Sequence, residues 1–135
     1  MKANELMIGD WVECVDSTHK KKVYAQIDAI EEGQTCILVR LDNCNWFLDI
    51  SFIKPIPLIR NILESNGWSP VEGVCASILI HNGYNLSILH WAKPGVNLTI
   101  DKGGYGPNLV CMPIYYVHEL QHALRLCGIE KEIVL

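Results

Sequence analysis

The chain has 135 residues, half of them hydrophobic, and a formal net charge of −4. A chain of this length and apolar content buries roughly two-thirds of its unfolded surface, which excludes a disordered tail. The negative charge disfavours a general nucleic-acid binder, because neutralising phosphates requires clustered lysine and arginine side chains.

Residues 1–56 show the pattern of short strands separated by turns. We predict strands at 11–15, 23–30, 35–41 and 46–50, with turns at 31–34 and 42–45. In the second of these strands, alternation places Val23, Ala25, Ile27 and Ala29 on one face. The spacing predicts a small antiparallel module, and an SH3-like β-barrel matches its size.

A proline pair marks the predicted start of a second module at 57–135. Pro55 and Pro57 cannot donate hydrogen bonds to a sheet, and proline is well suited to precede a helix. Apolar residues then recur with helical spacing, which predicts a connecting helix at 58–66. Gly67 follows as a suitable left-handed stop for this helix.

The second module is predicted to be an antiparallel sheet packed by a C-terminal helix. Strands are expected within 71–112, where Asn82-Gly83 between two apolar runs is a strong hairpin signal. Pro113 is expected to open the final helix at 114–127, with Gly128 just past its end. Together, the two modules predict an α+β fold.

The segment 118–122 fits the H-E-x-x-H pattern of zinc hydrolases. On a helix, residues four apart share a face, so His118 and His122 could ligate one Zn²⁺. Glu119, next to the first histidine, would then act as general base on a zinc-bound water. A zinc-dependent hydrolase with catalytic Glu119 is therefore one hypothesis.

The rest of the sequence disfavours this zinc hypothesis, because a catalytic zinc needs a third protein ligand. His81, His90 and Asp101 are available from the predicted sheet, but no spacing singles out any of them. Only seven residues follow Gly128, which leaves little chain to build the second wall of a cleft. We therefore predict no catalytic residue, no bound metal and no cofactor.

The apolar pattern of the final helix also points away from catalysis. It predicts a core stripe formed by Val117, Leu120, Leu124 and Cys127. At 100° per residue, His118, His122 and Arg125 then lie together on a polar face. The permanent charge of the arginine would repel a dication held by the two histidines.

Two other segments raise weaker hypotheses. Lys20, Lys21 and Lys22 form the only basic run, which offers a nucleic-acid-binding hypothesis, although such a run is usually a solvated loop. The glycine-rich segment 103–107 lacks the Gly-Lys-Ser/Thr ending of a phosphate loop, so we interpret it as a turn.

The cysteines and the N-terminus indicate a cytoplasmic protein. None of the six cysteines forms a Cys-x-x-Cys pair, and several lie in apolar runs, as expected of reduced buried thiols. Residues 1–10 have no apolar signal core, and no run of about 18 apolar residues is present. We therefore expect no membrane span.

Three segments resemble a family of small proteins of Bacteroides and related gut bacteria. They are Ile8-Gly9-Asp10-Trp11-Val12, the stretch from Pro55-Ile56-Pro57-Leu58 to Asn66-Gly67-Trp68, and the ending Tyr116 to Ile129. Many members lie in prophage-like or other mobile regions. The resemblance implies a β module, a connecting helix and a sheet closed by a C-terminal helix, and it implies no catalytic residues.

The function that the sequence favours is a non-enzymatic binding or interaction module encoded by a mobile element. Four tryptophans, Trp11, Trp46, Trp68 and Trp91, could anchor an interface, although in a small chain such residues usually belong to the core. The net charge favours a protein partner over nucleic acid. The oligomeric state does not follow from the sequence.

Overall fold

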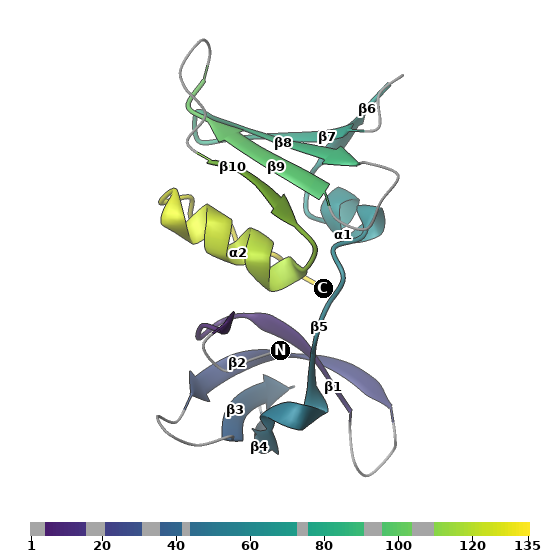
Figure 1. The fold of residues 1–135 in the computed structure, drawn as a ribbon, viewed down its shortest axis with the longest axis vertical. Coiled ribbons are helices and arrows are strands. Elements are labelled where there is room, and N and C mark those ends of the chain that lie inside the picture. Colours follow the sequence, from purple (N-terminus) through teal and green to yellow (C-terminus); the bar gives the residue numbers. More distant parts are fainter. Residues whose placement is uncertain are drawn as a thin grey trace. The chain divides into compact units, whose positions relative to one another are not determined.

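A computed structural model of the chain describes residues 5–15, 21–30, 36–41, 44–72, 76–90, 96–103 and 110–135. The chain divides into two compact units, Met1–Ile56 and Pro57–Leu135, which we call the N-terminal and C-terminal units. Each unit contains one five-stranded antiparallel sheet, and the C-terminal unit adds two α-helices, which makes the fold α+β (Figure 1).

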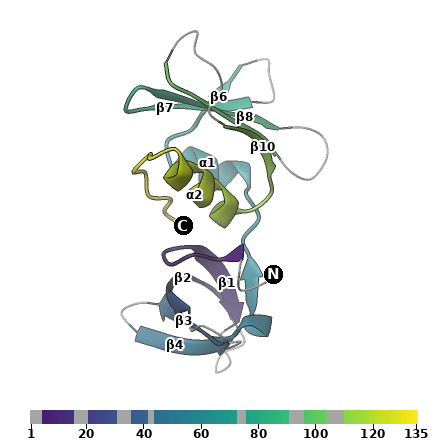
Figure 2. The same ribbon diagram turned by 60° about the vertical axis from the view of Figure 1, so that its left-hand side comes forward.

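The sheet of the N-terminal unit has the strand order β4-β3-β2-β1-β5 and curls on itself (Figures 1 and 2). Its strands are β1 Trp11–Val15, β2 Lys22–Ile30, β3 Cys36–Leu41, β4 Cys44–Asp49 and β5 Ile53–Pro55. A 3-10 helix, η2 Ile50–Phe52, connects β4 to β5, so that the last strand returns beside the first.

A tight turn leads into β1. The N–H of Asp10 donates to the carbonyl of Met7 at 3.2 Å, and Gly9 adopts a φ of 85° between them. Glycine is favoured there because the third position of a type II turn requires positive φ. The buried Asp10 carboxylate also accepts a hydrogen bond from the Met7 N–H at 2.8 Å. The Ile8-Gly9-Asp10 segment therefore has a structural role.

A β-bulge in β2 changes which of its side chains face the core, compared with the prediction from the sequence. The register between β2 and β3 shifts between Ile27 and Ala29. One extra residue reverses the alternation beyond that point. As a result Ile30 packs against the core, and the prediction that Ala29 continues the face of Val23, Ala25 and Ile27 is wrong.

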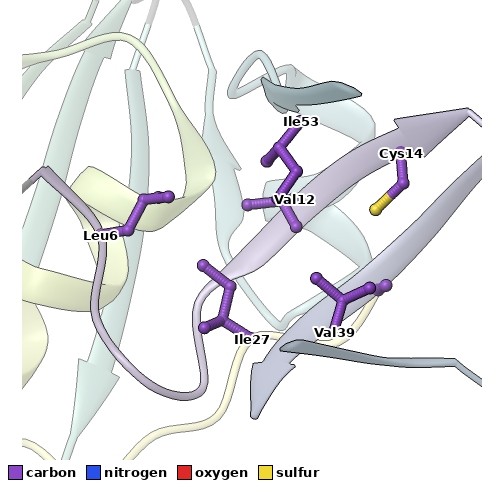
Figure 3. Packing of buried hydrophobic residues seen from close by; sticks show 7 residues of the cluster. Leu6, Val12, Cys14, Ile27, Val39 and Ile53 are labelled. Atoms are coloured by element: carbon purple, nitrogen blue, oxygen red, sulfur yellow. The ribbon is translucent and has the colours of Figure 1, made fainter. Parts of the chain in front are cut away.

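The core of the N-terminal unit lies inside the curled sheet. Figure 3 shows the side chains of Val12, Ile27, Val39 and Ile53 converging from β1, β2, β3 and β5. Cys14 lies in the same cluster at 1% exposure and is a free thiol. The short β5 therefore contributes to the core, although the sequence analysis did not predict it.

The fourth strand begins earlier than predicted. We expected a turn at 42–45 and a strand from 46, but β4 starts at Cys44, directly opposite Leu41. Leu41 and Cys44 are thus the pair at which the two strands begin to bond. Pairing with β3 thus extends the strand into residues whose local composition favours a turn.

The sheet of the C-terminal unit has the order β10-β9-β8-β7-β6. Its strands are β6 Ser69–Val71, β7 Ala76–His81, β8 Tyr84–His90, β9 Val96–Asp101 and β10 Val110–Ile114. The helices α1 Arg60–Ser65 and α2 Val117–Leu126 pack on one face of this sheet (Figures 1 and 2). No helix in the described ranges is long and apolar enough to cross a membrane.

The predicted hairpin at Asn82-Gly83 is confirmed. His81 pairs with Tyr84, and the two residues between them have φ values of 48° and 82°. Positive φ at both central positions defines a type I′ turn, whose twist matches that of the flanking strands. This short sequence alone therefore determined the register of β7 and β8.

The final helix begins later than predicted, at Val117 in place of 114. Pro113 does not open it, because this residue lies in β10 opposite Asn97. Proline has no N–H to donate, which confines it to an edge strand such as β10. The strand therefore continues through Ile114, the residue at which we expected the helix to begin.

The connecting helix also starts two residues later than predicted, at Arg60. Pairing with the segment after β10 holds the preceding residues extended. Pro57 forms an isolated bridge with Tyr116, and the Leu58 N–H donates to the Tyr115 carbonyl at 2.9 Å. Local helical spacing was therefore overridden by a contact with a segment far along the chain.

The predicted stop at Gly67 is confirmed, and it takes the form of a Schellman motif. Gly67 has a φ of 86°, and its N–H donates to the Glu64 carbonyl at 3.0 Å. The Trp68 N–H reaches back to the Leu63 carbonyl at 3.0 Å. Trp68 and Leu63 are both buried, which supplies the apolar contact that accompanies this motif.

Helix α2 ends in the same way around Gly128, which was predicted to follow it. Gly128 has a φ of 66° and donates to the Arg125 carbonyl at 3.0 Å. The Ile129 N–H donates to the Leu124 carbonyl at 2.9 Å. Both described helices of the unit therefore end at a position with positive φ, which glycine adopts without strain.

Candidate functional site

The H-E-x-x-H motif lies in the first turns of α2, because Tyr116 is the cap residue and Val117 the first helical residue. Glu119 is therefore the third residue of the helix. A glutamate at this position commonly accepts hydrogen bonds from the backbone ahead of the helix, as one half of a capping box. The position itself thus suggests a structural role for the carboxylate.

The contacts of Glu119 agree with that role. Its Oε2 accepts hydrogen bonds from the N–H of Tyr115 at 2.6 Å and from the N–H of Tyr116 at 3.2 Å. Both donors are backbone groups that precede the helix and lack partners within it. The carboxylate that would serve as general base in a zinc hydrolase is thus folded back over the helix N-terminus.

The two histidines of the motif take part in a row of packed rings. The ring of His118 stacks on that of Tyr116, with centroids 5.7 Å apart and planes inclined by 8°. The rings of His118 and His122 meet edge to face, with centroids 5.7 Å apart. Tyr115 extends the row beyond Tyr116. These contacts make the imidazoles part of the packing around α2.

The prediction that His118 lies on an exposed polar face is wrong. His118 is only 5% exposed, whereas Arg125 is exposed as expected. The ring of Tyr116 covers His118, and the apolar stripe alone could not reveal this cover. Within the stripe, burial is confirmed for Val117, Leu120 and Leu124.

The other member of the predicted stripe, Cys127, is only partly buried. It is the cap residue of the helix, at the point where the chain turns away. Ala123 and Gln121 are buried in the same helix at 1% and 7% exposure. The covered surface of α2 is therefore broader than the apolar pattern indicates.

The residues considered as a third zinc ligand lie at scattered positions in the sheet. Asp101 ends β9, and its Oδ1 accepts a hydrogen bond from Asn85 Nδ2 at 2.9 Å. His81 ends β7 and approaches Asn82 Nδ2 at 3.3 Å, while His90 ends β8. Within the described ranges, no three or more His, Cys, Asp or Glu residues are grouped to hold a metal ion.

The lysine cluster is only partly within the described structure. Lys20 lies outside it, whereas Lys21 and Lys22 are exposed at the start of β2. Lys22 Nζ lies 3.1 Å from Glu13 Oε1, so part of this positive charge is compensated. Of the glycine-rich segment, only Gly103 is described.

The tryptophans do not form an exposed binding surface in the part of the chain that the structure describes. Trp68 is 2% exposed and belongs to the core of the C-terminal unit. Trp46 is half-buried and packs against the N-terminal core, and Trp11 is half-buried in β1. Trp91 lies outside the described residues.

The sheet of the C-terminal unit has one face that carries no helix, which we call the open face. The register assigns to it Ser69, Val71, Ala76, Ile78, Ile80, Asn85, Ser87, Leu89, Asn97, Thr99, Asp101, Cys111 and Pro113. Residues of the opposite parity, such as Leu86, Ile88, Leu98 and Ile100, are fully buried. The sequence analysis did not predict this open face.

Apolar and polar residues separate on the open face. Ile78 and Ile80 of β7 are 40% and 72% exposed, and Leu89 of β8 is 36% exposed. Towards β9 the face becomes polar, with the hydrogen-bonded pair Asn85 and Asp101. The feature of the sequence that could have revealed this apolar face is the run Ile78-Leu79-Ile80, because consecutive apolar residues give a strand two apolar faces.

The capping role of Glu119 leads to a direct expectation. Glu119→Ala should lower the free energy of unfolding by about 1 kcal/mol, because two backbone N–H groups lose their acceptor. Glu119→Gln keeps an acceptor oxygen and should lose less. Urea denaturation followed by circular dichroism measures both. Equal stability of Glu119→Ala and the wild type would contradict the role.

Comparison of the chain with protein-family models, with curated proteins and with solved structures finds no match.

Proposed function

We propose that the protein is a non-enzymatic protein-interaction module of the cytoplasm that binds its partner on the open face. The observation that carries this proposal is the exposure of Ile78 and Ile80 side by side on one strand. Apolar side chains gathered on one face of a sheet are typical of surfaces that become covered by a partner. The engagement of Glu119 in a helix cap disfavours the hydrolase alternative.

The composition of the open face favours protein over nucleic acid as the partner. Its described strand residues include the carboxylate of Asp101 and no lysine or arginine. A phosphate backbone would find no positive charge there. The complementary partner is a protein segment whose apolar side chains cover the isoleucines and whose lysine or arginine faces Asp101.

The decisive experiment compares matched variants of two exposed apolar residues. Ile80→Glu places a charge in the centre of the proposed interface, whereas Leu126→Glu places one on α2, where Leu126 is 79% exposed. The immobilised proteins are incubated with nuclease-treated lysate of the native host, and captured proteins are identified by mass spectrometry. The affinity of the captured partner is then measured for each variant.

We expect Ile80→Glu to weaken this binding at least about tenfold, because burying a large aliphatic side chain contributes about 1.5–3 kcal/mol. Leu126→Glu should bind like the wild type. Thermal unfolding checks that both variants remain folded. Equal capture by all three proteins would contradict the proposal, as would the absence of any captured partner.

We further propose that the N-terminal unit is an SH3-like barrel. The strand order β4-β3-β2-β1-β5 supports this assignment, as does the 3-10 helix between the last two strands. Since unrelated functions share such barrels, the fold alone implies no ligand. A solution structure of the N-terminal unit with a splayed, open sheet would contradict the assignment.

Membership of the Bacteroides family and an origin in a mobile element remain proposals. The segments that carry the resemblance have structural roles in this chain. Ile8-Gly9-Asp10 forms the turn before β1, and the glycines of Asn66-Gly67-Trp68 and Cys127-Gly128-Ile129 end the two helices. The resemblance therefore concerns the scaffold, and the open face would be the part that adapts to a partner.

A further inference from the structure

The segment after α2, residues 129–135, forms neither helix nor strand, and we call it the C-terminal segment. It is docked through alternate residues. Ile129 and Ile133 are 4% and 2% exposed and Lys131 between them is half-buried, whereas the residues at 130, 132 and 134 are exposed. A segment without helix or sheet stays ordered only where specific contacts hold it. Its contacts therefore show which groups of the unit recognise it.

Asn66, the cap residue of α1, binds the C-terminal segment through the backbone of one residue. Its Oδ1 accepts from the Val134 N–H and its Nδ2 donates to the Val134 carbonyl, both at 2.8 Å. Nδ2 also donates to the Ile62 carbonyl, which determines how the amide is oriented. The Val134 side chain itself is 61% exposed. Asn66 thus recognises a peptide backbone and leaves the side chain at this position free to vary.

Trp68, two residues after Asn66, supplies the second contact. The Lys131 ammonium lies over its ring, 5.9 Å from the centroid, where the ring attracts a cation. The indole Nε1 is buried, yet it has no hydrogen-bond partner among the described residues. Buried donors are nearly always paired. The C-terminal segment therefore covers this indole while leaving one of its polar groups unused.

We propose that Asn66 and Trp68 form a binding site for a peptide segment of a partner protein, and that the C-terminal segment occupies it as an internal competitor. The contacts of the C-terminal segment give the chemistry of the ligand. It has lysine or arginine against Trp68, an aliphatic residue at the position of Ile133, and then any residue that Asn66 holds by its backbone. A segment that also gives the Trp68 N–H an acceptor would bind better, because a buried unpaired donor is costly.

The C-terminal segment can leave this site without opening α2. The bonds that close the helix end involve only the N–H groups of Gly128 and Ile129, so residues 130–135 are not needed for them. The site is also separate from the open face, because Asn66 and Trp68 belong to no strand of the sheet. The proposal therefore stands or falls independently of a partner on the open face.

Two substitutions at Val134 test the backbone recognition. Val134→Pro removes the N–H that Asn66 Oδ1 accepts, whereas Val134→Ala keeps it and shortens only an exposed side chain. Hydrogen exchange followed by mass spectrometry should show residues 130–135 exchanging about tenfold faster in Val134→Pro. Val134→Ala should exchange like the wild type. Equal protection in all three proteins would overturn the role of Asn66 on which the site rests.

A synthetic peptide of residues 128–135, blocked at both ends and carrying a fluorophore, probes the site directly. Val134→Pro should bind it at least about tenfold more tightly than the wild type, whose own segment competes at a high effective concentration. The same peptide carrying Ile133→Glu should not bind. The double variant Asn66→Ala/Val134→Pro should not bind the original peptide. Circular dichroism confirms that each variant is folded.

The wild type gives a second measurement that requires no substitution. Excess peptide should accelerate the exchange of the chain's own residues 130–135, because the peptide takes their place. The proposal would be overturned if the peptide failed to bind folded Val134→Pro, or if it left exchange in the wild type unchanged. Equal binding of the peptide carrying Ile133→Glu would also overturn it, since binding would then not use the site.

Discussion

Asn66→Ala is expected to lower the free energy of unfolding by about 1–3 kcal/mol, because the N–H and the C=O of Val134 both lose their side-chain partner. The Asn66 side chain binds the backbone of Val134 on both sides. Its Nδ2 donates to the Val134 carbonyl and its Oδ1 accepts from the Val134 N–H, both at 2.8 Å. Nδ2 also donates to the Ile62 carbonyl at 2.8 Å. Asn66 is only 7% exposed, so these bonds are made by a buried side chain.

The neighbouring residue provides a matched control for this substitution. Ser65 Oγ donates to the same Ile62 carbonyl at 3.0 Å, but from an exposed position. Ser65→Ala should therefore change the stability by less than about 0.5 kcal/mol. Urea denaturation of both variants gives the comparison. Hydrogen exchange of the Val134 amide should accelerate in Asn66→Ala only. A loss of similar size in both variants would mean that Asn66 does not hold the C-terminal segment.

The Cys14 thiol is expected to react with iodoacetamide at least about a hundredfold more slowly than Cys111 in the native protein. Cys14 lies in the core of the N-terminal unit, and burial is the main cause that raises its pKa from 9.0 to about 11. The Glu13 carboxylate contributes to the same rise. At neutral pH this lowers the fraction of reactive thiolate about a hundredfold. Cys111 is an exposed free thiol on the open face.

Peptide mass spectrometry after timed alkylation resolves the two sites. Cys127 should react at an intermediate rate, because partial burial raises its pKa as well. In denaturant, Cys14 and Cys111 should react at similar rates, which serves as the control. Native rates within tenfold of each other would contradict the burial of Cys14, or would show that the N-terminal unit opens readily.

Because the pKa of Cys14 is raised, we also expect the protein to lose stability in alkali. The folded pKa of Cys14 lies above the unfolded value, so folding favours the protonated thiol. This contribution is fully present below pH 9 and is lost as the pH rises through about 11. Cys14→Ala should remove this part of the pH dependence, although it also leaves a small cavity. Denaturation of both proteins at neutral and alkaline pH measures the difference.

Residue spacing predicted part of the surroundings of the H-E-x-x-H motif in α2. The spacing of His118 and His122 was correctly read as one helix turn, and burial confirms three of the four residues of the core stripe. The sequence could not show that the Tyr116 ring covers His118, because this depends on the angle at which the chain enters the helix. The capping role of Glu119 could be inferred only once the start of the helix was known, because it depends on Glu119 being the third helical residue.

Local preferences alone determined the hairpin turn at Asn82-Gly83 and the ends of both described helices. Asn82-Gly83, Gly67 and Gly128 lie where predicted, because each needs positive φ and the neighbouring residues supply the remaining hydrogen bonds. These features involve only residues close together in the sequence. The alternation in the first half of β2 was likewise sufficient to identify its core face.

Tertiary structure decided the features that depend on distant pairing. Because Pro57 forms a bridge with Tyr116, α1 begins later than its apolar spacing predicts. Because Pro113 pairs with Asn97 of β9, it lies in a strand and does not open a helix. The exposure of Ile80 depends on where the helices pack, since a strand with two apolar faces can bury either. The sequence by itself thus specified the hairpin turn of β7 and β8 and the ends of both described helices, because these depend on neighbouring residues, whereas the packing of the elements determined which apolar side chains remained exposed.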